Sequence, residues 1–261
     1  MIPKTIHYCW LSGEPVPESL KSYIDGWKRF FPDYQFVLWT KDNFDIDSVP
    51  FVSQACSVKK WAFAADYIRL YALYNLGGIY LDSDVEIVNT FDRFLDYGFF
   101  TSLEYHHKDA LRLGTFDLIN EDGSSKEKHT PKPGICLQAA IMGAEPGHPF
   151  LKQCLDYYQD RDFILADGSF YNKIILPDIL AMNAEDFGFR YLDTEQHLSS
   201  DMHIFPSYYF AGCESEIHDG CYAIHHCAGS WREQDNSFKA RVIRKTKKLL
   251  KRMISPGKKR I

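Results

Sequence analysis

Apolar residues recur along the chain with two periods, which together predict alternating strands and helices. The runs "TIHYCWL" and "YQFVLWT" are short, apolar and aromatic, as in buried strands. Between them, "PESLKSYIDGWKRFFPDY" has apolar residues at helical spacing. A second helical pattern runs from about residue 57 to 76, where two glycines end it, and a third strand follows over residues 79–87. This order predicts an α/β fold with a parallel sheet.

The pattern is less regular after residue 105. Residues 106–133 are polar and without periodicity, which predicts a functional lid, a binding loop or a disordered segment. Strand character returns in "ICLQAAIMGA", a helix is predicted over "HPFLKQCLDYYQD", and "CYAIHHCAGSW" predicts a late strand.

Composition favours an ordinary globular protein that holds its core without cross-links. The chain has 261 residues, of which 45% are apolar and 25% charged. Its seven cysteines are odd in number and include no C-x-x-C pair, so we expect reduced thiols rather than disulfides or a zinc site. The sequence opens without a basic-then-apolar leader and has no apolar run of membrane-spanning length, so we expect a cytoplasmic protein.

Charge is distributed unevenly along the chain. Residues 239–261 carry eleven Lys or Arg and no acidic residue, which leaves 19 basic against 35 acidic residues in 1–238. An acidic body argues against a nucleic-acid partner. The tail, 239–261, predicts either a basic amphipathic helix on the anionic inner face of the cell membrane or a solvated basic extension.

Two carboxylates interrupt the third predicted strand. In a regular strand Asp82 and Asp84 would share a face with Tyr80, with the two acids about 7 Å apart. Paired carboxylates at the carboxyl end of a strand can hold Mg²⁺ or Mn²⁺, which completes its shell with phosphate oxygens and water. Taken alone, a D-x-D pair is more typical of a solvated turn at a strand end.

The residues around this pair resemble a known enzyme family. "ADYIRLYALYNLGGIYLDSDV", the amino-terminal "IPKTIHYCW" and the late "AIHHCAGSW" resemble, in that order, DxD-containing glycosyltransferases of the sugar-binding-region family. Relatives of that family include α-mannosyltransferases, α-galactosyltransferases and enzymes of capsular polysaccharide or lipopolysaccharide synthesis. The clostridial glucosylating toxins have more distantly similar catalytic domains.

The resemblance implies a GT-A fold, with a Rossmann-like mixed sheet flanked by helices in a single domain over residues 1–238. The nucleotide-sugar part would span about 1–100 and the acceptor side about 101–210. It also implies a nucleotide-sugar donor, with a UDP-sugar favoured, and a Mn²⁺ or Mg²⁺ ion. Transfer would proceed with retention of configuration to a saccharide or lipid-linked glycan acceptor in bacterial surface polysaccharide synthesis.

The resemblance assigns roles around the two carboxylates. Asp84 would bind the metal directly, and Asp82 would reach the metal, the ribose or the donor sugar. Asp66 and Arg69 stand three apart on the second predicted helix and so share a face. They would contact donor sugar and nucleotide, with Arg69 counted beside Asp82 and Asp84 as catalytic. The alternative for Asp66 and Arg69 is a local surface ion pair.

Three further residues are donor-binding candidates by the same resemblance. Trp10, at the end of the first strand, would stack on the nucleotide base, and Tyr80 would line the pocket. Gln138, just before the "AAIMGA" strand, would face the donor sugar. For each of these side chains, packing in the core is the alternative.

The late "HHCAGSW" supplies the remaining candidates. Its His-x-x-Gly pattern followed by Trp resembles the carboxy-terminal metal ligand of related retaining transferases, which implies His226, rather than His225, as the second metal ligand. A neutral imidazole suits Mn²⁺. Since neighbouring residues in a strand point in opposite directions, only one of the two histidines should bind metal. Ser230 and Trp231 would contact the diphosphate.

Two other functions also fit parts of the pattern. A phosphatase of the haloacid dehalogenase type also has D-x-D after an apolar strand, but it requires Thr or Val where this chain has Glu86. A non-catalytic nucleotide-sugar-binding relic is the other alternative, and the intact Asp82, Asp84 and His226 count against it.

Overall fold

A computed structural model describes residues 1–171, 173–212 and 218–227, all of which belong to one compact unit. The predicted tail 239–261, the domain boundary at residue 238, and the candidates Ser230 and Trp231 lie outside the described residues. None of the helices in the described ranges is long and apolar enough to cross a membrane. The cysteines within those ranges are free thiols, as expected.

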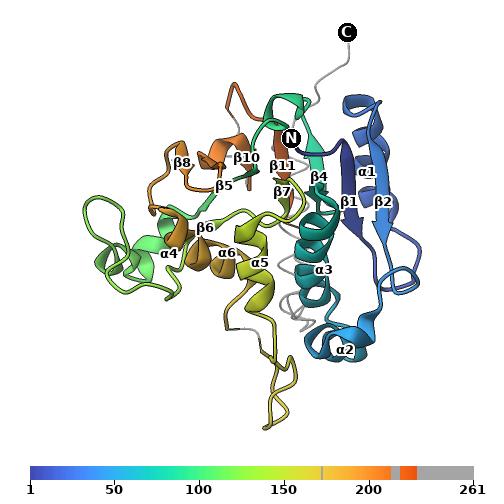
Figure 1. Ribbon diagram of the computed structural model, residues 1–261, viewed down its shortest axis with the longest axis horizontal. Helices are drawn as coiled ribbons and strands as arrows, with labels where there is room; N and C mark the ends of the chain where they lie inside the picture. Colours follow the sequence, from blue (N-terminus) through green and yellow to red (C-terminus); the bar gives the residue numbers. More distant parts are fainter. Residues whose placement is uncertain (172, 213–217, 228–261) are drawn as a thin grey trace, which may run out of the picture. The chain divides into compact units, whose positions relative to one another are not determined.

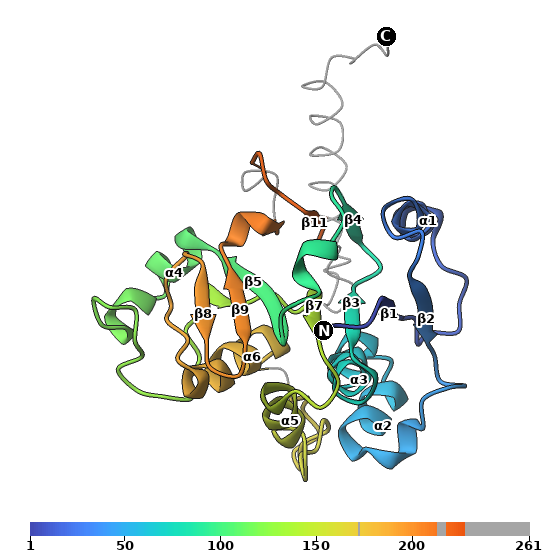
Figure 2. The same ribbon diagram turned by 45° about the horizontal axis from the view of Figure 1, so that its top comes forward.

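A mixed sheet forms the centre of the unit. Its strands lie in the order β2-β1-β3-β7-β5-β9-β8, and β6 pairs with β5 (Figure 2). The bounds are β1 Thr5–Cys9, β2 Gln35–Trp39, β3 Gly78–Leu81, β5 Phe99–Tyr105, β6 Ile135–Leu137, β7 Ile141–Ala144, β8 Gln196–Leu198 and β9 Met202–Phe205.

The α/β class and the mixed sheet flanked by helices are confirmed, and the parallel arrangement predicted from the first strands is limited to β2, β1 and β3. Strands β2, β1 and β3 run parallel, as strand–helix–strand units predict. Strand β7 pairs antiparallel with both β3 and β5. The chain reaches β7 only after it has turned back through β5 and β6, so no single crossover helix sets its direction.

Helices cover both faces of this sheet (Figure 1). Helix α3 packs against β1, β3 and β7 and against helices α2 and α5. It ends at Gly77, whose φ of +64° and close approach to Pro146 exclude a side chain. The helix bounds are α1 Glu18–Phe30, α2 Pro50–Ser57, α3 Trp61–Leu76, α4 His107–Arg112, α5 Pro149–Asp156 and α6 Leu176–Ala184.

Apolar cores lie on both faces of the sheet, which explains why its inner strands are continuously apolar. One core cluster contains residues of α2, α3, α5 and α6, and the other contains Trp27 of α1 and Phe91, Phe94 and Phe210. All four residues of β3 are buried. His7 has a structural role, because its Nε2 lies 2.8 Å from the Gly77 carbonyl and its Nδ1 accepts from the Trp39 indole at 3.2 Å.

The single strand predicted over 79–87 is two strands in two sheets. Strand β3 ends at Leu81, and β4 (Val85–Ile87) joins a small sheet with β10 (Phe210–Ala211) and β11 (Ala223–His225), in the order β10-β11-β4. Asp82 and Asp84 occupy the turn between them, where Val85 N–H donates to the Asp82 carbonyl at 3.0 Å. The prediction that both acids lie within one regular strand is therefore wrong, because the chain passes from one sheet to the other at this turn.

Two other segments also differ from their predictions. The polar stretch 106–133 includes α4 and a 3-10 helix at Thr115–Leu118, so it is more ordered than a structureless loop. The stretch "ICLQAAIMGA" divides into β6 and β7, and residues 138–140 lie between them. Because both strands are apolar and buried, hydrophobicity alone shows no break.

Candidate functional site

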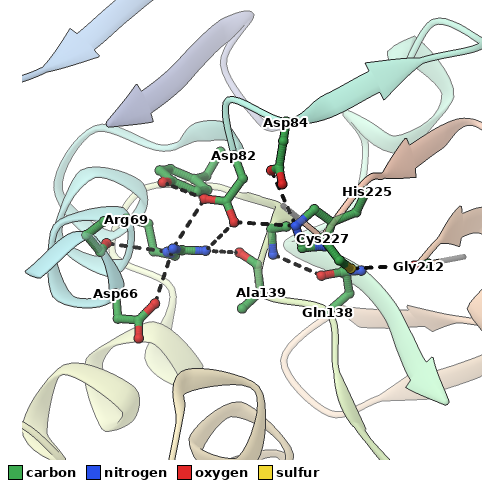
Figure 3. Close-up of polar contacts among 12 residues, drawn as sticks. Asp66, Arg69, Asp82, Asp84, Gln138, Ala139, Gly212, His225 and Cys227 are labelled. Carbon is green, nitrogen blue, oxygen red and sulfur yellow. Dashed lines mark hydrogen bonds and ion pairs between the residues drawn. The ribbon is translucent and has the colours of Figure 1, made fainter. Parts of the chain in front are cut away.

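Five charged side chains from distant parts of the sequence meet beside the β3–β4 turn (Figure 3). Helix α3 supplies Asp66 and Arg69, the turn supplies Asp82 and Asp84, and β11 supplies His225. We call these five residues the acidic cluster. The structure thus brings together four predicted site residues with one histidine of the predicted pair.

Arg69 is the buried centre of the cluster, with a side chain only 5% exposed. Its Nη2 lies 3.1 Å from Asp66 Oδ1 and 3.3 Å from Asp82 Oδ1, and its Nη1 donates to the Ala139 carbonyl at 2.7 Å. The alternative of a surface ion pair is therefore wrong, because this arginine neutralises two carboxylates inside the protein. Burial raises the pKa of Asp66 to about 7, and Arg69 acts in the opposite direction.

Asp82 is fixed from a second side by Tyr80. The Tyr80 hydroxyl donates to Asp82 Oδ1 at 3.0 Å, and the Arg69 guanidinium lies over the Tyr80 ring at 4.6 Å from its centroid. A cation over an aromatic face is favourable and holds both groups in place. Tyr80 is thus a buried positioning residue for Asp82, rather than a side chain open to the site.

His225 reaches the two aspartates from the opposite direction. Its Nε2 lies 3.4 Å from Asp84 Oδ1 and 4.0 Å from Asp82 Oδ2. Burial acts to lower the pKa of His225, but its hydrogen bonds with Asp84 and Cys227 outweigh burial and raise that pKa to about 11. A cation bound between the aspartates would displace this proton, because an imidazole binds metal only in its neutral form.

The structure places His225, and not the predicted His226, at this point. Strand β11 pairs antiparallel with β4, and His225 lies opposite Val85, next to Asp84. His226 points elsewhere, with its Nε2 2.9 Å from Glu86 Oε2 and its ring stacked on Tyr23. His225 therefore replaces His226 as the candidate metal ligand. The pairing of β11 with β4 decides which of these two neighbouring side chains faces the turn.

The cluster has a donor set suited to a divalent cation. Asp82, Asp84 and His225 each offer one ligand atom, and these three atoms lie within 4.8 Å of one another. Two carboxylate oxygens and one imidazole nitrogen suit Mn²⁺, and the oxygens alone suit Mg²⁺. Their side chains are 26%, 12% and 16% exposed, so solvent and a ligand reach them from one side.

The end of strand β1 approaches the same cluster. Burial raises the pKa of the Cys9 thiol to about 12, and the charges of Arg69 and Asp82 also act on it. Trp10, the next residue, is half-buried, and its indole donates to the Glu14 carbonyl at 2.6 Å. No described contact joins Trp10 to the cluster, so its role as a base platform stays a prediction.

Gln138 lies in the connection between β6 and β7, beside the carbonyl that Arg69 binds (Figure 3). Its Oε1 accepts from Ala140 N–H at 3.1 Å, and its side chain is buried. Among the described residues, its Nε2 has no hydrogen-bond partner. A buried amide donor without a partner is costly unless something absent from the structure accepts from it, which suits a bound polar ligand.

Sequence reasoning did not anticipate some members of the site. The Ala139 carbonyl is a backbone group and carries no motif, and Cys227, whose thiol lies 3.5 Å from His225 Nδ1, occupies a variable position of the late His-x-x-Gly pattern. The adjacent pair His225–His226 did carry a signal, because both residues lie in the late motif. Only the pairing of β11 with β4 separates their roles.

Comparisons with known proteins find similar sequences for the segment that carries Asp82 and Asp84. Residues 17–100 match the family model described as "glycosyltransferase sugar-binding region containing DXD motif". Inositol phosphoceramide mannosyltransferases 3 and 2 of Schizosaccharomyces pombe are 33% and 35% identical over 58% and 37% of this chain. The matched parts cover 36% and 29% of those proteins, so the chain spans about a third of their length.

The solved structures that match this chain include the PaToxG glycosyltransferase, with a TM-score of 0.48 and 16% identity over 71% of this chain and 69% of that one. The galactosyltransferase LgtC has a TM-score of 0.45 and 12% identity over 92% and 94% of the two chains. The family match covers α1, α3 and the β3–β4 turn, and therefore both aspartates of the cluster. Residues 17–100, which carry both aspartates, thus match the glycosyltransferase sugar-binding regions that contain a DXD motif.

Proposed function

We propose that this protein is a divalent-metal-dependent glycosyltransferase that moves a hexose from a nucleotide-sugar donor to a saccharide or lipid-linked acceptor. The observation that carries the proposal is the convergence of Asp82, Asp84 and His225, backed by a buried arginine, within a DXD sugar-binding region. A solvated D-x-D turn would need neither the arginine nor a histidine delivered from β11.

A divalent cation held by Asp82, Asp84 and His225 would offset the negative charge of the diphosphate leaving group. The buried Arg69 offsets the negative charge of Asp66 and Asp82. This reduces the repulsion among the carboxylates of the cluster. The Gln138 Nε2 offers an N–H to a donor-sugar hydroxyl. Trp10 would supply an aromatic face for the base. Ser230 and Trp231 lie outside the described residues, and their contacts with the diphosphate stay predictions of the sequence resemblance.

The reaction proceeds with retention in this proposal. The acceptor hydroxyl attacks from the face that the diphosphate leaves, and its proton passes to a leaving-group oxygen. The C–O bond to the acceptor forms as the C–O bond to the diphosphate breaks. No side-chain nucleophile is required, so the cluster only has to bind, orient and neutralise charge.

The relatives bear on the donor and acceptor classes. Three relatives from S. pombe are named inositol phosphoceramide mannosyltransferases, which supports a mannosyl donor and a lipid-linked acceptor. A UDP-sugar and a role in bacterial surface polysaccharide synthesis remain the predictions of the sequence resemblance. A lipid-linked acceptor would place the protein at a membrane surface, where its basic segment 239–261 would favour anionic lipids.

Thermal unfolding with a panel of donors tests the proposal. GDP-mannose, UDP-glucose and UDP-galactose are each added with and without Mn²⁺, and the donor that binds should raise the melting temperature only when metal is present. Asp84→Asn should abolish the shift, and Glu86→Gln, which changes an exposed neighbouring carboxylate, should preserve it. Release of free sugar or transfer to an acceptor is then measured with the same donor.

The alternatives give different results. Hydrolysis of p-nitrophenyl phosphate that depends on Asp82 would support the phosphatase. Tight donor binding without hydrolysis or transfer would support a binding relic. A donor-induced shift that survives Asp84→Asn would contradict the metal role of the cluster.

A further inference from the structure

A second group of metal-ligating side chains lies on the hairpin β8–β9, at the edge of the sheet remote from β3. In the strand order β3-β7-β5-β9-β8, three neighbours separate β3 from β8, so this group is distinct from the acidic cluster (Figure 2). Its members are Glu195, His197, Asp201 and His203. We propose that these residues form a second metal site that takes a borderline divalent ion of the Zn²⁺ type.

Strand register puts the four side chains together. His197 and His203 are directly opposite each other in the antiparallel pair, so they share one face. Glu195 and Asp201 lie just outside the two strands, and their carboxylates come within 3.5 Å of His197 and 3.8 Å of His203. Glu195, His197 and His203 each offer one ligand atom, and these atoms lie within 4.8 Å of one another.

The distances suit a tetrahedral ion. Zn²⁺ at about 2.0–2.1 Å from nitrogen ligands separates neighbouring ligand atoms by about 3.3 Å. His197 Nδ1 lies 3.2 Å from His203 Nε2, and Asp201 Oδ1 lies 3.8 Å from the same Nε2. Glu195 Oε1 lies 3.5 Å from His197 Nε2, where it can accept the other N–H of that ring. A carboxylate behind a ligating imidazole is the usual support in such sites.

The surroundings hold these groups in place. The Tyr97 ring stacks on His203 at 3.6 Å between centroids. The second oxygen of Asp201, Oδ2, accepts Gly98 N–H at 2.8 Å, which leaves Oδ1 directed at His203. The side chains of His197 and Asp201 are 64% and 61% exposed, so an ion enters directly from solvent. Two imidazoles with carboxylates favour Zn²⁺ over the Mg²⁺ or Mn²⁺ suited to an oxygen-rich site.

The β8–β9 hairpin has a positive-φ turn and a short edge strand, which a bound ion would stabilise. Ser200 and Asp201 both have positive φ, +58° and +54°, a conformation that costs free energy for residues other than glycine. Strand β8 has only three residues and β9 as its single partner. An ion that joins His197 to His203 would close this short edge hairpin across the strained turn.

Cobalt substitution tests the proposal on the whole chain. Metal-free protein is titrated with Co²⁺, and the visible d–d bands of a tetrahedral ion are recorded before displacement with Zn²⁺. The wild type and Asp84→Ala should both develop the bands, because the acidic cluster is not the source. His197→Ala, which removes an exposed side chain, should weaken Co²⁺ binding by about 100-fold or more. His218→Ala, another exposed histidine, should bind like the wild type.

Unfolding supplies a second readout. Saturating Zn²⁺ should raise the melting temperature of the wild type and of Asp84→Ala, but not that of His197→Ala. The proposal is overturned if the wild type shows no tetrahedral bands, or if His197→Ala keeps both the bands and the Zn²⁺-dependent shift. Loss of the bands in Asp84→Ala alone would also overturn it, since that would locate the ion at the acidic cluster.

Discussion

Arg69 binds Asp82 with both terminal nitrogens of its guanidinium. Nη2 lies 3.3 Å from Oδ1 and Nη1 donates to Oδ2 at 3.4 Å, while Nη2 also reaches Asp66 at 3.1 Å. The two planar groups therefore face each other as a fork, the geometry in which arginine and carboxylate interact most strongly. The orientation of Asp82 within the turn depends on this buried cation.

Arg69→Met should destabilise the protein and abolish transfer together. The substitution leaves Asp66 and Asp82 without their buried partner, at a cost of about 3 kcal/mol or more in the free energy of unfolding. Urea denaturation measures this change. Arg112→Met, which breaks the exposed pair with Asp109, is the control and should have little effect. Equal effects of the two substitutions would contradict the central place of Arg69.

His225→Ala should weaken Mn²⁺ binding and metal-dependent transfer by about 100-fold, because an imidazole ligand is lost from the cluster. His226→Ala should leave Mn²⁺ affinity unchanged, since that ring contacts Glu86 and Tyr23. Electron paramagnetic resonance of free Mn²⁺ measures both affinities. The reverse pattern would restore His226 as the ligand predicted from its motif.

Asp66 should make the stability of the metal-free protein depend on pH. Its pKa is raised from 3.8 to about 7 in the folded protein, so the folded state keeps a proton that the unfolded state releases. The stability from this group is therefore complete below about pH 4 and is lost as the pH rises toward 7. Urea midpoints for Asp66→Asn should fall less than those of the wild type between pH 5 and 7.5.

Urea midpoints measured at pH 5 serve as the control for Asp66→Asn. At pH 5 the wild-type side chain carries its proton, and an amide of the same size should give a similar midpoint. If the wild type and the variant lost stability in parallel across this range, Asp66 would not be the titrating group.

Gln138→Met should reduce kcat/KM for the donor by at least about tenfold, because the free Nε2 donor would no longer reach the sugar. The loss of the single bond from Ala140 N–H to Oε1 should lower stability by only about 1 kcal/mol. Thr101→Val is a matched control, since its hydroxyl donates to the Gln138 and Ile141 carbonyls. It should affect stability more than donor use. Unchanged kinetics in Gln138→Met would remove Gln138 from the site.

Local patterns were enough to predict much of this fold and part of its site. Helix α3 and strand β1 follow from apolar spacing and from the glycines after Leu76, and the spacing of Asp66 and Arg69 places them on one helix face. The break between β3 and β4 was not predictable, because Val85 and Ile87 continue the apolar pattern of β3 and the two sheets are set by distant partners. For the same reason, neither the choice of His225 nor the meeting of His197 with His203 could be predicted from the sequence.

The pairing of β11 with β4 has a consequence for biosynthesis. A nascent polypeptide carries Asp82 and Asp84 long before the ribosome has made the strand that brings His225 to them. Until that strand has been made, the β3–β4 turn lacks the imidazole of His225. The centre becomes complete only when this late strand has docked, so catalytic competence should appear after most of the tertiary structure has formed.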